Sequence, residues 1–367
     1  MTAVVGQRAL NRALLARQLL LERTSMAVAD AIEHLVGQQA QVPKDPYVGL
    51  WSRLDAFDPS ELGTMVEDRR VVRAALMRAT IHLVTARDAV RLRPLVQPVL
   101  ERTFTTGSPY GRRLRGVDLD EVLELGRASV EDRPRTRADL VAAFAERWPD
   151  ADADAMGYAV QYLVPLVQVP PRGVWGKGGR ATWASMERWL GRPFDERPSI
   201  DDLVVRYLGA FGPASVMDMQ SWSGLTRLKE VFERLRSQLR VDRNEAGRDV
   251  FDLPDAPRPD PDTPAPPRFL PEYDNLLLGH ADRTRLVSHE YRRELMAAAG
   301  TKTVNTFLLD GVVAGTWTVL RDGDAATLVV EPAVAVPKRA RAAVVEEGTR
   351  MLTFSAADAA SHAVEVR

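Results

Sequence analysis

Apolar residues recur at helical spacing near the start of the chain and then give way to strict alternation. Positions three and four apart predict helices over residues 7–22 and 26–37, and a capped helix is expected from Ser60. The run VVRAALMRATIHLVT at 71–85 alternates as two strands, and a further helix is expected to open at about residue 87. The predicted order is therefore helices followed by a hairpin and another helix.

This order of elements returns twice. The second occurrence has three helical patterns, with Thr136 as a cap, and then a glycine-rich hairpin; the stretches are 118–132, 136–148, 153–167 and 167–190. The third has helices over 199–212, 213–225 and 226–239, with Pro213 in a first turn, and a hairpin over 240–253. Helix-turn-helix plus hairpin, repeated in this way, predicts an α+β chain with three tandem winged-helix motifs at 1–115, 116–197 and 198–253.

The last third of the chain has a different pattern. Residues 254–271 contain eight of the 24 prolines, which indicates an extended connector. Beyond it, strand-like segments beginning at residue 301 and a helix at 338–354 predict a C-terminal β-rich, α+β module over 272–367.

Composition narrows the function classes. The chain has 367 residues, 45% hydrophobic and 27% charged, and no apolar run long enough for a membrane span. Arginines interrupt the apolar pattern of the first 24 residues, so an amphipathic helix is expected there rather than a signal peptide. There is no cysteine, and the five histidines do not have metal-ligand spacing. We therefore expect a cytoplasmic protein without metal or cofactor.

A net charge of −1 conceals an uneven distribution, because residues 1–115 hold 17 Lys and Arg against 11 Asp and Glu. A basic N-terminal third favours contact with DNA phosphates. The candidate contacts are Arg78 and His82 on an alternating strand, the wing residues Arg172, Lys177 and Arg180, and Arg283 with Arg285 in a turn-rich run. For Arg78 the alternative interpretation is an exposed polar position of a wing strand, and for the wing residues it is a solvated hairpin tip. For the turn-rich run, which also contains Asp274, Asn275 and His280, it is an interdomain brace of salt bridges.

Familiar catalytic motifs such as GxSxG, a Walker loop or HExxH are missing from the chain. The unusual segment is GQQAQVPKDPYVGLW, in which Gln38, Gln39 and Gln41 follow the second helix. A carboxamide is not a useful base, but it can hold a water molecule through its acceptor and two donors. From these residues alone, a polar helix end exposed to solvent is the favoured interpretation of the segment.

Several segments together resemble the AlkZ-type winged-helix DNA glycosylases, the superfamily that includes the YcaQ enzymes. They are LARQLLLER, GQQAQVPKDPYVGLWSRL, MRATIHLVTARD, PPRGVWGKGGRATW, PEYDNLLLGHADR and DGVVAGTW, which together span nearly the whole chain. The family signature is Gln-aliphatic-Gln in the AlkZ branch and Gln-aliphatic-Asp in the YcaQ branch. Here it is matched by Gln39-Ala40-Gln41, with alanine as a small occupant of the aliphatic position.

The resemblance implies a monofunctional glycosylase that excises N7-alkylated purines, including bulky adducts and interstrand cross-links made by azinomycin-like natural products. Gln39 and Gln41 would position the water and the sugar, and Lys44, the lysine of this segment, is counted among the DNA contacts. The implied partner is double-stranded DNA carrying such lesions, with no membrane and no obligatory protein partner, at the nucleoid. The alternative is a non-catalytic winged-helix DNA-binding protein, either a transcriptional regulator or a toxin-sequestering protein.

Overall fold

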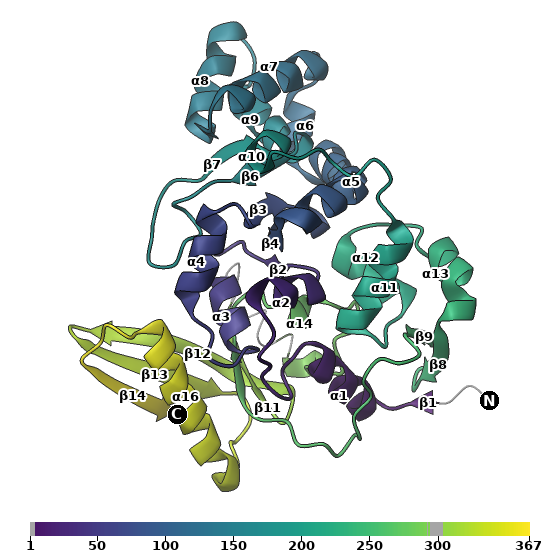
Figure 1. Ribbon diagram of the computed structural model, residues 1–367, viewed down its shortest axis with the longest axis vertical. Helices are drawn as coiled ribbons and strands as arrows, with labels where there is room; N and C mark the ends of the chain where they lie inside the picture. The colour runs from purple at the N-terminus through teal and green to yellow at the C-terminus, as the bar shows by residue number, and fades with distance from the viewer. Residues whose placement is uncertain (1–3, 292, 294–303) are drawn as a thin grey trace.

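Three sheets organise the described part of the chain, with helices packed around them (Figure 1). The computed structural model describes residues 4–291, 293 and 304–367. Each of the three hairpins expected from the sequence is present, and the mixture of helices and sheets confirms the α+β class. No helix among the described residues is long and apolar enough to cross a membrane.

The first hairpin forms where the alternation predicts it, as β3 (Val71–Ala75) and β4 (Ile81–Thr85). The helices before it are shorter than expected, and the fourth begins one residue early, because the side chain of Asp58 caps it by accepting from the Ser60 amide. The bounds are α1 (Gln7–Arg17), α2 (Val28–His34), α3 (Asp45–Trp51), α4 (Pro59–Glu67) and, after the hairpin, α5 (Ala86–Arg102).

The second and third parts follow the predicted order. Thr136 caps α8 in a capping box with Asp139, as expected. The elements of the second part are α6 (Pro109–Arg113), α7 (Leu119–Asp132), β5 (Arg135–Thr136), α8 (Arg137–Arg147), α9 (Ala153–Leu163), β6 (Leu166–Gln168), β7 (Thr182–Ser185) and α10 (Met186–Leu190). Those of the third are α11 (Ile200–Phe211), α12 (Val216–Ser223), α13 (Lys229–Leu235), β8 (Arg240–Asn244) and β9 (Asp249–Asp252).

The expected role of Pro213 is wrong. Ser215 is the N-cap of α12 and forms a capping box with Asp218, so Pro213 lies before the helix. The third helix of this part is also half the predicted length, because it begins only at Lys229 and tightens into a 3-10 turn at Arg236.

The hairpins of the first two parts join in one six-stranded sheet with the order β2-β4-β3-β6-β7-β5, in which β2 is the short strand Gln38–Gln39. Strands β3 and β6 pair antiparallel, with Arg73 opposite Gln168. The expected division at residue 115 therefore runs through a shared sheet. One face of this sheet packs on the largest apolar core through Ala74, Val84 and Val167.

The proline-rich connector is held in place rather than free. Two buried arginines of α1 donate to its carbonyls, Arg12 to Thr263 O and Arg17 to Pro257 O. Its end forms β10 (Arg268–Leu270), a strand of the C-terminal sheet, which corrects the prediction of a connector without elements. The remaining elements are α14 (Asn275–Leu278), β11 (Thr306–Leu309), β12 (Val312–Asp322), β13 (Ala325–Pro332), α16 (Lys338–Ser355) and β14 (Ser361–Val366); residues 301–303 of the predicted first strand lie outside the described residues.

Candidate active site

The segment Gly37–Gln41 is fixed on the edge of the six-stranded sheet. Gly37 has φ +82°, and a Cβ at this position would meet Val84 Cγ1 at 2.5 Å, so the close turn out of α2 requires glycine. Gln39 then pairs with His82 of β4, and the Ala40 amide donates to Ile81 O at 2.7 Å. The backbone that carries the glutamines is therefore set by ladder hydrogen bonds.

The Gln39 side chain is buried and oriented by an arginine. It is 5% exposed, and its Oε1 accepts from Arg78 Nη2 at 2.5 Å. Arg78 also donates to Trp222 O, from a turn in which its own φ is +54°. Burial and the nearby Arg283 lower the pKa of Arg78 to about 10, so the guanidinium stays charged at neutral pH. With its oxygen engaged, Gln39 presents its Nε2 hydrogens, which no described residue accepts.

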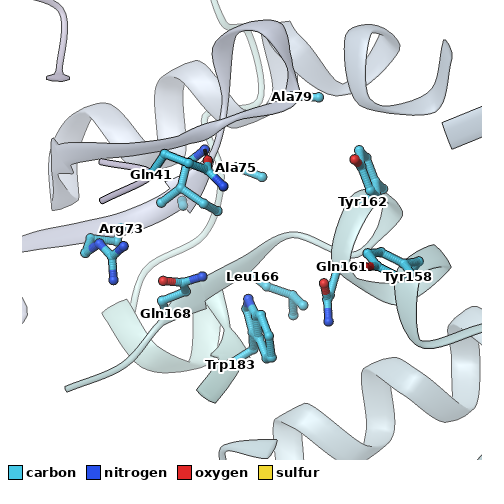
Figure 2. Close-up of a pocket in the computed structure, with 12 residues that line it drawn as sticks. Gln41, Arg73, Ala75, Ala79, Tyr158, Gln161, Tyr162, Leu166, Gln168 and Trp183 are labelled. Atoms are coloured by element: carbon cyan, nitrogen blue, oxygen red, sulfur yellow. Dashed lines mark hydrogen bonds between the residues drawn. The ribbon is translucent and has the colours of Figure 1, made fainter. Parts of the chain in front are cut away.

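The Gln41 side chain is exposed and turns back toward the sheet. Its Oε1 accepts weakly from the Ile81 amide at 3.3 Å, which leaves capacity for a further donor. The same side chain lines a pocket of about 250 Å³ (Figure 2). The two amides of the motif are thus in different states, one oriented by a cation and the other open to a cavity.

This cavity, which we call the β3–β6 pocket, lies between the six-stranded sheet and α9. Arg73, Gln168 and Trp183 are directly opposed on β3, β6 and β7, so their side chains share one face of the sheet. Figure 2 shows these residues around a common space with Gln161 and Tyr162 of α9. The pocket therefore combines amides, aromatic rings and a buried cation.

On another side, the segment is held by a group of buried residues that we call the clamp (Arg53, Asp274 and Asn275). Asp274 and Asn275 lie more than 200 positions further along the chain. Asn275 accepts from the Gln39 amide at 3.2 Å and donates to Gly37 O at 2.5 Å. Asp274 binds Arg53 through two hydrogen bonds of 2.8 and 2.7 Å, and both side chains are buried. The expected salt-bridge brace in the run PEYDNLLLGHADRTRL is therefore present in this pair.

Asp45 is an unpaired carboxylate beside the clamp. It is 1% exposed, its Oδ2 has no hydrogen-bond partner, and the Tyr273 amide donates to it. Burial, together with the negative charge of Glu272, raises the pKa of Asp45 to about 7. Among the described residues, no three His, Cys, Asp or Glu side chains are grouped as a metal site would need.

Two predicted DNA contacts are not on the surface. His82 is 1% exposed, and burial together with Arg78 lowers its pKa to about 3, so it is a neutral core residue. Arg285 is 6% exposed and donates to Pro213 O, where it braces the third part of the chain. Arg78 is also misplaced in the prediction, because it lies in the turn between β3 and β4 and points at Gln39 rather than outward. The alternating pattern from which exposure was predicted holds within β3 and β4, but Arg78 lies in the turn between these strands.

The other predicted contacts are accessible. Lys44 is exposed, Arg172 and Arg283 are half-buried, and Lys177 and Arg180 are exposed on the wing. Lys177 pairs with Glu67 at 2.5 Å, and Arg172 donates to Gly179 O within the wing itself. The wing therefore has the geometry of a solvated hairpin tip, which was the alternative interpretation.

Sequence reasoning missed Arg73, Gln161, Gln168 and Trp183, and it named Asn275 only as a member of the turn-rich run, without a role at the glutamines. Arg73 could have been noticed because it is a charged residue at a core-facing position of the alternating run VVRAA. Asn275 had a weaker signal, as part of the clustered polar residues in PEYDN. The two glutamines in the second part had none.

Comparison with known proteins gives a family and a shared fold. A model of the family described as DNA glycosylase AlkZ-like matches residues 32–354. The interstrand DNA cross-link repair glycosylase of Streptomyces sahachiroi is 26% identical over 329 residues, which cover 83% of this chain and 85% of that protein. The solved structure of the DNA glycosylase AlkZ from the same organism matches 99% of this chain and 100% of its own, with a TM-score of 0.78 and 22% identity, and shows a shared fold.

Proposed function

Because the chain belongs to the family of AlkZ-like DNA glycosylases, we propose that it excises purines alkylated at N7 from double-stranded DNA, including bulky adducts and interstrand cross-links. The Streptomyces sahachiroi relative is named for cross-link repair. Azinomycin-like natural products would be the source of such lesions. The biological role would then be DNA repair and self-resistance in the cytoplasm, at the nucleoid.

The chemistry suits a site without a strong acid or base. Alkylation at N7 gives the purine a positive charge, so when the C1′–N9 bond breaks, its electron pair goes to N9 and the base leaves neutral. The sugar becomes oxocarbenium-like, a water oxygen bonds to C1′, and the released proton goes to solvent. What the protein must supply is orientation of that water and of the sugar.

The two glutamines divide this task. Arg78 engages the oxygen of Gln39 and polarises its amide, so Gln39 offers strong N–H donors to a sugar or phosphate oxygen. Gln41 keeps most of its acceptor capacity and would take a hydrogen bond from the water, so that the water oxygen faces C1′. The observation that carries the proposal is this pair of amides fixed on one segment, with the second at a pocket.

The DNA contacts of this proposal are the accessible cations Lys44, Arg172, Lys177, Arg180 and Arg283. Each would neutralise a phosphate, so binding should weaken steeply with salt. Lys44 is expected to act only as a cation, and the enzyme should leave an abasic site without cutting the strand.

The test uses a duplex with a single 7-methylguanine or a single azinomycin cross-link, incubated with the protein and then treated with alkali. We expect strand breaks at the lesion only after alkali, and about a hundredfold or greater loss of rate in Gln39→Ala and Gln41→Ala. Gln238→Ala, an exposed glutamine on the 3-10 turn after α13, is the matched control. Binding to all alkylated duplexes without any abasic product would instead support the non-catalytic DNA-binding protein.

A further inference from the structure

The walls of the β3–β6 pocket contain polar atoms that nothing satisfies. Arg73 Nε and Nη1, Gln161 Nε2 and Gln168 Oε1 are buried and have no hydrogen-bond partner. Buried polar groups without partners are costly and uncommon, and they concentrate where a ligand or ordered water completes the site. Four such atoms belong to residues that line one cavity, which indicates that these side chains would turn to meet a polar guest.

Arg73 is the most unusual of these groups. Its side chain is 2% exposed and donates only to Ala40 O at 2.7 Å, and no described carboxylate lies within ion-pair distance. Gly173 passes directly over it, since a Cβ there would meet Arg73 Cδ at 2.7 Å. Tyr47 fixes this arrangement by donating to Gly173 O at 2.8 Å. The cation is thus held at the pocket by its surroundings without being neutralised.

Flat surfaces complete the cavity. Trp183 lies on the sheet face beside Gln168, and Tyr162 and Tyr158 approach from α9. Tyr158 is itself occupied, with Tyr110 stacked on it and the Arg137 guanidinium 3.7 Å from its ring centroid. Trp183 has no ring partner among the described residues, so its indole is the surface available for a planar guest.

We propose that the β3–β6 pocket receives the purine base of the damaged nucleotide, with Trp183 against its ring and the amides of Gln161 and Gln168 on its hydrogen-bonding edge. This inference rests on the proposed function. Guanine presents acceptors at O6 and N3 and donors at N1 and N2, and rotation of each amide lets it serve either kind. The Arg73 guanidinium would add a donor for O6.

Size and chemistry distinguish a base from other guests. A pocket of about 250 Å³ is below the range of about 300–1,000 Å³ typical of drug-sized ligands, so a single bicyclic base fits better than a whole natural product. A phosphate would use Arg73, but it would leave the two aromatic walls and an amide acceptor without a role. The combination favours a planar heterocycle.

The positive charge of Arg73 also favours the neutral base that leaves over the positively charged base that is still attached to the sugar. Burial and Arg172 lower the pKa of Arg73 to about 10, so it remains a cation at neutral pH. It repels a purine that is positively charged at N7 and attracts the O6 of the neutral base formed when the C1′–N9 bond breaks. The interaction thus strengthens along the reaction coordinate, which is the condition for a contribution to rate.

The experiment measures binding of free 7-methylguanine to the intact protein by equilibrium dialysis, and inhibition of excision by the same compound. We expect saturable binding, competitive with lesion DNA, that Gln161→Leu and Gln168→Leu each weaken about tenfold, the effect of losing one hydrogen bond to a buried partner. Gln238→Leu should bind like the unchanged protein. Thermal unfolding monitors the fold, and if Gln168→Leu does not fold, Gln161→Leu, at a half-buried position of α9, carries the test.

Two outcomes overturn the inference while leaving the proposed function intact. In one, the protein excises 7-methylguanine but the free base neither binds nor inhibits at millimolar concentration, or binds equally to both leucine variants. In the other, inorganic phosphate displaces the base, which would mark an anion site. Binding of the free base that depends on Gln161 and Gln168, without excision from any duplex, would support the pocket and refute the proposed function.

Discussion

The clamp and the β3–β6 pocket both hold the segment Gly37–Gln41, and each contains a buried arginine in a very different state. In the clamp, Arg53 has a carboxylate on both terminal nitrogens, which leaves only its Nε without a partner. In the pocket, Arg73 has one carbonyl and no carboxylate. Both are almost completely buried, so burial does not explain the difference. Removing the carboxylate of the paired cation would leave a buried charge uncompensated, whereas the unpaired cation lies at the pocket for which we propose a guest.

The largest effect should come from breaking the clamp pair. Asp274→Ala leaves the Arg53 guanidinium buried without its carboxylate, which should lower the free energy of unfolding by about 3–5 kcal/mol in urea denaturation. Glu67→Ala removes the half-exposed partner of Lys177 and should cost less than about 1 kcal/mol. Equal losses in the two variants would show that the clamp pair has no special structural role.

Asp45 should sharpen the comparison through its pH dependence. Because the native state keeps its proton up to about pH 7 while the unfolded chain releases it near 3.8, the stability that the protonated group contributes is present below pH 3.8 and is lost as pH rises to 7. Asp45→Asn should therefore equal the unchanged protein in stability at pH 3.5 and exceed it at pH 8. The expected gain in the free energy of unfolding is about 1.4 kcal/mol for each pH unit between 3.8 and about 7. The exposed Asp55→Asn is the control; a gain that does not vary with pH would contradict the assignment.

Asn275 tests whether the clamp acts on catalysis as well as on stability. Asn275→Ala removes both hydrogen bonds to the segment, so we expect kcat for 7-methylguanine excision to fall about tenfold with KM nearly unchanged. Asn275→Asp keeps the acceptor for the Gln39 amide and should recover part of the rate. A kcat within twofold of normal in the alanine variant would limit Asn275 to a structural role.

The smallest effect should be at the wing. Lys177→Ala and Arg180→Ala should each lower the slope of log affinity against log salt by about one, because each removes one phosphate contact. Arg339→Ala, an exposed residue of α16, should leave the slope unchanged. If both wing variants keep the full slope, the wing is not part of the DNA surface.

Local patterns predicted the elements well and their junctions poorly. The alternation at 71–85 and the cap at Thr136 report interactions within a few residues, and both elements form as expected. The bond from Asn275 to Gln39 joins residues 236 positions apart, and the pairing of β3 with β6 merges two predicted units. Neither has a local signature in one sequence.

The site was predictable only in part for the same reason. The resemblance identified Gln39 and Gln41, but not that Arg78 would turn inward through a positive φ to hold one of them. In α1, Arg12 and Arg17 looked like interruptions of an apolar face, yet they are buried because Asp310 and Asp252 pair with them and the proline-rich connector adds carbonyl acceptors. A partner supplied by distant chain decides whether a charged side chain lies inside or outside.

The shared sheet also constrains how the protein can meet different lesions. Since β3 and β6 are hydrogen-bonded neighbours, the first and second hairpins cannot hinge apart without breaking a ladder. The distance between the two hairpins is therefore fixed by the pairing of β3 with β6. Under the proposed function, adaptation to larger or smaller adducts would proceed by exchanging side chains of the β3–β6 pocket rather than by moving the two hairpins apart.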